Sequence, residues 1–144
     1  MLGKSRMDEN PSGSSKRKVE SMAKLLFQSG WSFCRVGEEE HMAPVSLPHD
    51  AMLAEPRRAD APGGTNTGWY VGCDYIYEKT FSAPAEWADR DVVLEFEGVY
   101  HNAEVWLNGE QIAFHAYGYT GFYVPLTGRV RLGEANTLRV VARN

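Results

Sequence analysis

The 144-residue sequence predicts an all-β fold, a β-sandwich of the jelly-roll or Greek-key type. Three observations favour this fold class. From residue 75 onward, apolar and polar residues alternate over short segments, which is the pattern of strands with one buried face. Gly, Pro and Asn residues that favour turns separate these segments. No convincing amphipathic helix pattern follows residue 40, and roughly six to eight short strands joined by turns are typical of sandwiches.

Length and composition indicate one globular domain. Hydrophobic residues make up 43% of the chain and charged residues 24%. A chain of this length can bury about two thirds of the surface that it exposes when unfolded. The longest apolar run is far shorter than the roughly 20 residues that a membrane-spanning helix needs. We therefore expect no membrane partner.

Charge is distributed unevenly along the chain. Residues 1–21 carry five Lys and Arg against three Asp and Glu, whereas the remainder carries ten against sixteen. The Lys16–Lys18 cluster is compatible with a nucleic-acid-binding tail, but a solvated leader explains it more simply. Because the acidic remainder has no basic stripe, we expect no nucleic-acid partner.

The polar N-terminal residues 1–21 are predicted to form a disordered leader, followed by one β-sandwich domain over residues 22–144. The leader lacks the apolar stretch of a secretory signal peptide. On this basis a cytoplasmic location is expected.

The first ordered elements are short. Lys24–Phe27 and Trp31–Val36 are apolar pieces on either side of a Ser29–Gly30 turn. Pro44–Pro48 predicts an extended edge strand, because each proline removes a hydrogen-bond donor from the sheet. Residues 50–68 are rich in Pro, Gly and Asp and predict a long surface loop. Loops of this length inside a domain are often functional.

Six strands are expected after this loop, over residues 75–81, 92–97, 102–108, 111–115, 122–126 and 137–142. In the second of them, Val92, Leu94 and Phe96 share one face, and the third and the last alternate in the same way. Asn108–Gly109 predicts a tight hairpin between the third and the fourth, since both residues tolerate the positive φ of a type I′ turn.

No catalytic group stands out in the sequence. It contains no Gly-x-Ser-x-Gly segment around a serine nucleophile and no phosphate-binding glycine loop. Acidic residues such as Glu95 and Glu104 occupy alternating strand positions, which predict a solvated sheet face. Cys34 and Cys73 lack the spacing of zinc ligands. We therefore expect no catalytic residue, no metal and no cofactor in this chain.

Two groups of residues are candidates for binding. His49 and Asp50 lie at the start of the long loop, where Asp50 either caps the loop backbone or contacts a ligand. Tyr117 and Tyr119 lie in a Gly-containing loop, and their flat faces and hydroxyls suit a sugar. For Tyr119, an aromatic plug buried at the end of the sandwich is an equal alternative.

Several of these segments together resemble a known family. They are FQSGWSF (27–33), VSLPHD (45–50), TGWY (67–70), YEKTF (77–81), LEFEGVYHNAEVWLNG (94–109) and YGYTGF (117–122). From about Leu25 to Asn144 the chain is similar to the N-terminal sugar-binding domain of glycoside hydrolase family 2, a galactose-binding-domain-like jelly roll. The family contains β-galactosidases, β-glucuronidases and β-mannosidases.

The resemblance implies a domain without catalytic residues. Family members continue with a closing strand, an immunoglobulin-like domain and a (β/α)₈ barrel that carries the two catalytic Glu residues. Because the chain stops at Asn144, it is expected to lack the final strand of its sandwich. A barrel takes roughly 250 residues, so the chain is also expected to be inactive alone. Its parent would be a retaining glycosidase, most closely of the β-galactosidase type. The implied partners are a β-glycoside and the catalytic barrel of the same parent protein.

The resemblance also implies which residues contact the sugar. In the family, loops of this sandwich help to shape the sugar pocket of the barrel. Substrate-binding roles are therefore expected for Asn66 in the long loop and for Tyr117 and Tyr119 in the loop after the hairpin, with His49 and Asp50 nearby. Two alternatives are a stand-alone carbohydrate-binding module and a structural sandwich whose aromatic residues all belong to the core.

Overall fold

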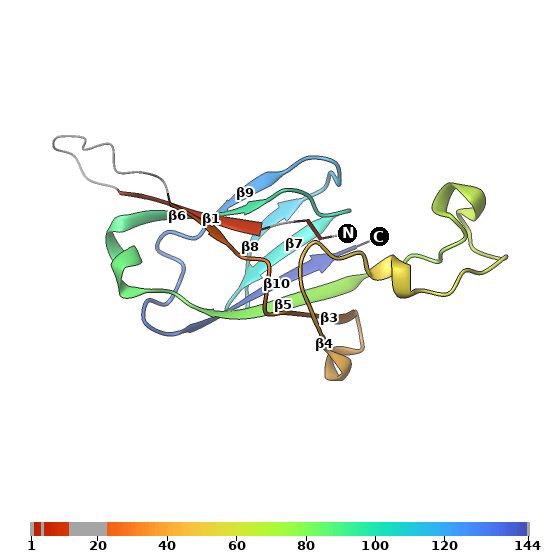
Figure 1. Ribbon diagram of the computed structural model, residues 1–144, viewed down its shortest axis with the longest axis horizontal. Helices are drawn as coiled ribbons and strands as arrows, with labels where there is room; N and C mark the ends of the chain where they lie inside the picture. Colours follow the sequence, from red (N-terminus) through yellow and green to blue (C-terminus); the bar gives the residue numbers. More distant parts are fainter. Residues whose placement is uncertain (1, 4, 12–22, 144) are drawn as a thin grey trace.

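The protein consists of two antiparallel β-sheets that enclose a hydrophobic core (Figure 1). The computed structural model describes residues 2, 3, 5–11 and 23–143. One sheet has four strands in the order β2–β1–β6–β9, and the other has six in the order β4–β3–β5–β10–β7–β8. This architecture confirms the predicted all-β sandwich.

The four-stranded sheet contains β1 (Ser5–Pro11), β2 (Ala23–Leu26), β6 (Arg90–Phe96) and β9 (Phe122–Pro125). The six-stranded sheet contains β3 (Trp31–Arg35), β4 (Ala43–Val45), β5 (Tyr75–Ser82), β7 (Ala103–Leu107), β8 (Glu110–His115) and β10 (Ala135–Ala142). Four short 3₁₀ turns join them: η1 (Glu39–His41), η2 (Ala51–Ala54), η3 (Gly64–Thr67) and η4 (Ala85–Asp89). Within the described ranges, no helix has the length and apolar character needed to span a membrane.

Alternation along the strands places one face of each sheet in the core, as predicted. Val92, Leu94 and Phe96 of β6 are buried against the inward residues of β7 and β10. The β7–β8 hairpin turns at Asn108 and Gly109 with φ values of 51° and 88°. These positive angles are those of the predicted type I′ turn, whose twist matches that of the flanking strands.

The structure corrects the expectation for the N-terminal residues. Ser5–Pro11 forms β1, which lies between β2 and β6 and pairs with both. Leu2 is buried, and its backbone exchanges hydrogen bonds of 3.1 and 3.3 Å with His49. The expected disordered leader over residues 1–21 is therefore wrong for these segments, and the remainder of it lies outside the described residues. Main-chain hydrogen bonds to two neighbours can hold a strand whose polar sequence carries no alternation of its own.

Three connections and the end of β10 meet at one end of the sandwich, which we call the loop end (Figure 1). The connections are residues 46–74 before β5, residues 97–102 between β6 and β7, and residues 116–121 between β8 and β9. They meet because β6 and β8 run toward this end, while β7 and β9 leave it. Segments far apart in the sequence thus come to lie side by side.

Candidate functional site

The loop end carries an aromatic surface built from two connections. Tyr100 contacts Tyr119 with ring centroids 5.5 Å apart, and Tyr119 contacts Tyr117 at 5.7 Å. We call these three residues the tyrosine cluster. Their exposed fractions are 38% for Tyr100, 58% for Tyr117 and 76% for Tyr119. Tyr119 is therefore not the buried plug that the sequence left open as an alternative.

Stacked rings close the base of the 116–121 connection. The His115 ring stacks on Phe122 at 4.4 Å, and Phe122 stacks on the buried Phe96 at 4.7 Å. His115 Nε2 also lies 3.2 Å from the Thr120 hydroxyl. Since His115 and Phe122 stand at the two ends of the connection, their contact fixes where its tyrosines emerge.

Gly118 allows this connection to press against the 97–102 connection. A Cβ atom on Gly118 would lie 2.5 Å from Cδ2 of Tyr100 and 3.1 Å from its Cα. Both distances are shorter than ordinary contacts, so a side chain here would push the two connections apart. The tyrosine cluster therefore depends on the absence of a side chain at this position.

Asp50 lies beside the tyrosine cluster. Its Oδ1 accepts a hydrogen bond of 3.1 Å from the backbone N–H of Met52 and so caps η2. Asp50 and Tyr100 also line one small pocket of about 10 Å³, enough for no more than a single water molecule. The capping role foreseen from the sequence is present, and the same side chain lies at the edge of the aromatic surface.

His49 packs beneath this surface rather than on it. Its Nδ1 lies 2.9 Å from the Tyr77 hydroxyl, and its ring lies 4.4 Å from the ring of Phe33. Burial lowers the pKa of the His49 imidazole, with the Asp50 carboxylate acting in the opposite direction. Burial also raises the pKa of the Tyr77 phenol, so Tyr77 stays protonated. His49 thus joins the loop end to the core through its contacts with Phe33 and Tyr77.

Asn66 lies apart from the other candidates. It is an exposed residue of η3, in the yellow-green part of the long connection, which extends beyond the sandwich in Figure 1. No contact between Asn66 and the tyrosine cluster is present among the described residues. The structure therefore brings Tyr117 and Tyr119 into contact, places Asp50 beside Tyr100 and His49 against Tyr77, and leaves Asn66 separate.

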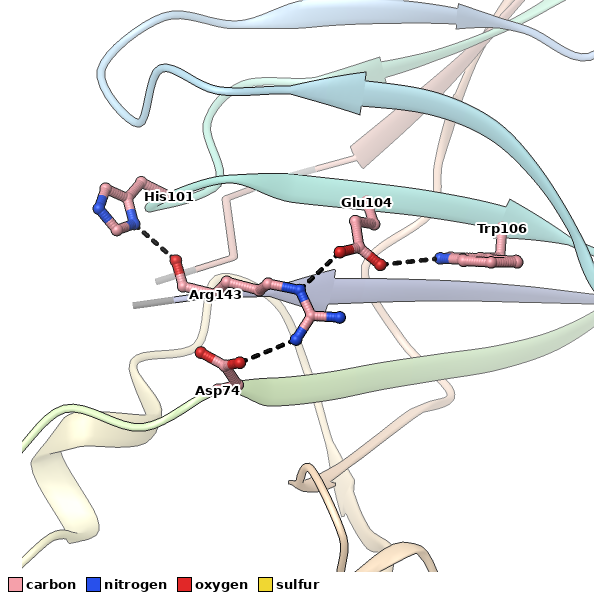
Figure 2. Close-up of polar contacts among 5 residues, drawn as sticks. All are labelled: Asp74, His101, Glu104, Trp106 and Arg143. Carbon is pink, nitrogen blue, oxygen red and sulfur yellow. Dashed lines mark hydrogen bonds and ion pairs between the residues drawn. The ribbon is translucent and has the colours of Figure 1, made fainter.

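An ion-pair network that the sequence did not reveal supports the tyrosine cluster (Figure 2). Arg143, just after β10, donates to Glu104 Oε1 at 2.5 Å and to Asp74 Oδ2 at 2.9 Å. Its carbonyl oxygen accepts a hydrogen bond of 2.6 Å from His101 Nδ1. The His101 ring in turn stacks on Tyr100 at 4.8 Å. Arg143 therefore anchors the 97–102 connection to the end of β10.

The electrostatics of this network favour permanent charges. The hydrogen bond from Arg143 lowers the pKa of the Glu104 carboxyl, and the same bond raises the pKa of the guanidinium. Glu104 also accepts a hydrogen bond of 3.4 Å from the Trp106 indole N–H. A carboxylate held in this way remains ionised near neutral pH and is unsuited to donating a proton.

The contribution of Tyr100 and Arg143 to the site could have been predicted only by considering how several strands are arranged in the sheets. Tyr100 lies in the short gap between two predicted strands. If consecutive strands are antiparallel, the Tyr117–Thr120 loop emerges at the same end of the sandwich as this gap. Arg143 follows the last strand at that same end. Neither residue lies in a motif of its own, which is why inspection of single segments missed both.

Comparison with known proteins identifies the family. Residues 31–144 match the family described as glycosyl hydrolase 2 galactose-binding domain-like. The match covers most of the chain, so the chain belongs to this family, and the resemblance seen in the sequence is confirmed.

Two relatives illustrate the similarity. A β-galactosidase of Bacteroides ovatus, BoGH2A, is 36% identical over 100 residues, which are 69% of this chain and 12% of that protein. A β-glucuronidase of Bacteroides fragilis is 37% identical over 124 residues, which are 83% of this chain and 16% of that protein. The chain therefore spans less than a fifth of the length of these relatives.

Solved structures agree in fold. A glycosyl hydrolase family 2 member from Bacteroides cellulosilyticus superposes with a TM-score of 0.77 at 31% identity, covering 82% of this chain and 17% of that one. A β-D-glucuronidase of Dictyoglomus thermophilum covers 98% of this chain and 20% of its own with a TM-score of 0.65, but at 19% identity it supports the fold alone. The chain thus corresponds to the N-terminal sandwich domain of family 2 glycosidases.

Proposed function

We propose that this chain is the non-catalytic, sugar-contacting domain of a retaining β-glycosidase of the β-galactosidase or β-glucuronidase type. Its loop end would form part of a β-glycoside site that a catalytic barrel of the same protein completes. Family membership supports this assignment, as do the names and the much greater length of the relatives.

The observation that carries the proposal is the exposed tyrosine cluster. Large aromatic side chains usually lose most of their exposure on folding, yet Tyr119 keeps 76% and Tyr117 keeps 58%. Contiguous exposed aromatic surface commonly marks a binding site. A sugar ring offers apolar C–H faces to such rings and hydroxyls to their phenols, and the Asp50 carboxylate lies beside Tyr100 to accept further hydrogen bonds.

The charged groups of the loop end support a binding role without catalysis. Retaining hydrolysis needs two carboxyl groups about 5–5.5 Å apart, one of which must donate a proton. Glu104 and Asp74 are both hydrogen-bonded to Arg143, and one oxygen of Asp50 caps η2. These carboxylates are held in structural contacts, so the acid and the nucleophile of the reaction would come from another part of the protein.

Titration of the isotopically labelled chain with methyl β-D-galactopyranoside and methyl β-D-glucuronide tests the proposal by NMR. At about 50 mM sugar, a concentration that reveals even very weak binding, the amide signals of Tyr117, Tyr119 and Asp50 should shift with at least one of the two. Tyr119→Ala should weaken the response about tenfold, as expected when an anchoring aromatic residue is removed.

Tyr123→Ala provides the matched control. Tyr123 is also an exposed tyrosine, at 62%, but it lies on β9 and donates a hydrogen bond to Glu95 on the outer face of the four-stranded sheet. This variant should keep the full response. Absence of any shift at the loop end with both sugars would contradict the assignment.

A further inference from the structure

A separate hollow lies on the outer face of the six-stranded sheet and reaches the Arg143 network at one end. It has a volume of about 540 Å³ and crosses β5, β10 and β7. We call it the sheet groove. This volume lies within the range of about 300–1,000 Å³ that is usual for small-molecule sites. The face is the one opposite to the main core.

The floor of the sheet groove is apolar. Ile76 of β5 and Val141 of β10 form a small buried cluster with Cys34 of β3, separate from the main core. Trp106 of β7 packs against this cluster and is half-buried. Its indole N–H donates to Glu104, which fixes the orientation of the ring on the sheet face (Figure 2).

The rim of the sheet groove is charged: its two arginines are paired with carboxylates, and Glu39 adds a further carboxylate. Arg139 donates a hydrogen bond of 2.9 Å to Glu78, and Arg143 bridges Glu104 and Asp74. The lining thus mixes both signs, with three carboxylates against two arginines, which disfavours an anionic ligand. The pairs leave guanidinium N–H donors and carboxylate acceptors along both sides of the groove.

This combination fits one ligand chemistry. A neutral molecule with many hydroxyl groups and an apolar ring face can exchange hydrogen bonds with paired charges while its ring rests on an indole and an aliphatic floor. We propose that the sheet groove is a second carbohydrate-binding site, which takes a neutral oligosaccharide with Trp106 as its stacking platform. The site is separate from the tyrosine cluster and does not rest on the function proposed for the loop end.

The geometry also accounts for an extended ligand rather than a single sugar. Trp106, the Glu78–Arg139 pair and the Glu104–Arg143 pair come from three neighbouring strands, so polar groups and the ring are distributed along the groove. Each further sugar unit meets another donor or acceptor. Affinity should therefore rise with chain length.

The indole N–H signals of the chain provide a direct test. Neutral tetrasaccharides of β-1,4-linked glucose, galactose, mannose and xylose are added to the labelled chain at up to about 10 mM, which detects millimolar binding. The Trp106 signal should shift with at least one of them, and the corresponding monosaccharide should bind about tenfold or more weakly. The buried Trp31 is the internal control, since it lies on the core side and should not respond.

Variants make the assignment specific. Trp106→Ala should reduce affinity about tenfold or more, which is typical for the loss of an anchoring aromatic side chain. Tyr123→Ala should leave it unchanged. The wild-type titration needs no substitution, so a Trp106 variant that failed to fold would not decide the question. If the Trp106 signal fails to move with all four tetrasaccharides, the proposal is wrong. Signals of Tyr117 and Tyr119 report separately on the loop-end proposal.

Discussion

At the residue scale, Arg143 and His49 show how single side chains tie the loop end to the sandwich. Arg143 contacts Glu104 and Asp74, which lie 39 and 69 residues away in the sequence, and its carbonyl holds His101 beneath Tyr100. His49 lies between Phe33 and Tyr77 on one side and the backbone of Leu2 on the other. Both residues position the aromatic surface without being part of it.

The half-buried imidazole of His49 predicts a pH dependence of stability. Burial lowers its folded-state pKa below the ordinary value of 6.5, so the unfolded chain binds more protons when the pH lies near these values. The free energy of unfolding should therefore fall as the pH decreases through 6.5 and should stop falling, as far as this group is concerned, below the folded-state pKa. The Asp50 carboxylate beside it limits the size of the effect.

Urea unfolding between about pH 7.5 and pH 5 measures this dependence. His49→Gln should remove that part of the slope. His41→Gln is the control, because the side chain of His41 is 74% exposed, and this variant should retain the slope of the parent. Equal slopes in the parent and in His49→Gln would show that His49 titrates alike in the folded and unfolded chains.

At the scale of elements, two connections hold each other in place at the loop end. The 97–102 connection supplies Tyr100 and His101, and the 116–121 connection supplies the other two tyrosines. The stack of His115 on Phe122 closes the second connection, while Gly118 permits its contact with the first. The aromatic surface is therefore a property of the pair of connections rather than of either one.

Gly118→Ala tests this mutual support. Its Cβ would overlap the Tyr100 ring and crowd the Tyr100 backbone, so we expect a destabilisation of about 1–3 kcal/mol, the usual range for overpacking. The melting temperature should fall, and the NMR response of Tyr119 to methyl β-glycosides should weaken. Gly98→Ala is the matched control in the facing connection, because its nearest neighbour, the Gly118 carbonyl oxygen, would lie at an ordinary 3.8 Å. Equal melting temperatures for the two variants would argue against the close fit.

At the scale of the whole molecule, the four-stranded sheet depends on its N-terminal strand. β1 pairs along its length with β6 and with all of β2, and Leu2 fills part of the core beside the loop end. Without β1, β2 and β6 would each lose a neighbour, and their backbone groups would lose partners that no other described strand supplies. The N-terminal residues thus complete the sandwich.

A chain that starts at Met22 tests the role of this strand. It loses β1 and also the buried Leu2 side chain, whose removal alone should cost about 2–5 kcal/mol. A domain of this size has a total stability of about 5–15 kcal/mol, so the shortened chain should be largely unfolded or aggregated. Leu2→Ala in the full chain should lower stability but keep a cooperative transition. Circular dichroism and urea unfolding measure both, and an unchanged midpoint for the shortened chain would mean that β1 contributes nothing.

Most of the strands could be predicted from the sequence because their signals are local. Alternation of apolar residues marks β6, β7 and β10, and Asn108–Gly109 has the backbone preference that its turn requires. The family resemblance likewise rests on short segments that can be read one at a time. At the candidate site, the same reading located Tyr117, Tyr119 and Asp50 but could not tell whether Tyr119 points into the core or into solvent.

What the sequence determined by itself is therefore the fold class, most strand positions, their buried faces and the family, since these follow from the order of neighbouring residues. Only the tertiary structure decided the place of β1, the exposure of the tyrosine cluster, the Arg143 network and the sheet groove. The physical reason is the same in each case. These features arise where strands distant in the chain pair or where connections meet, and such contacts leave no period or motif in any one segment.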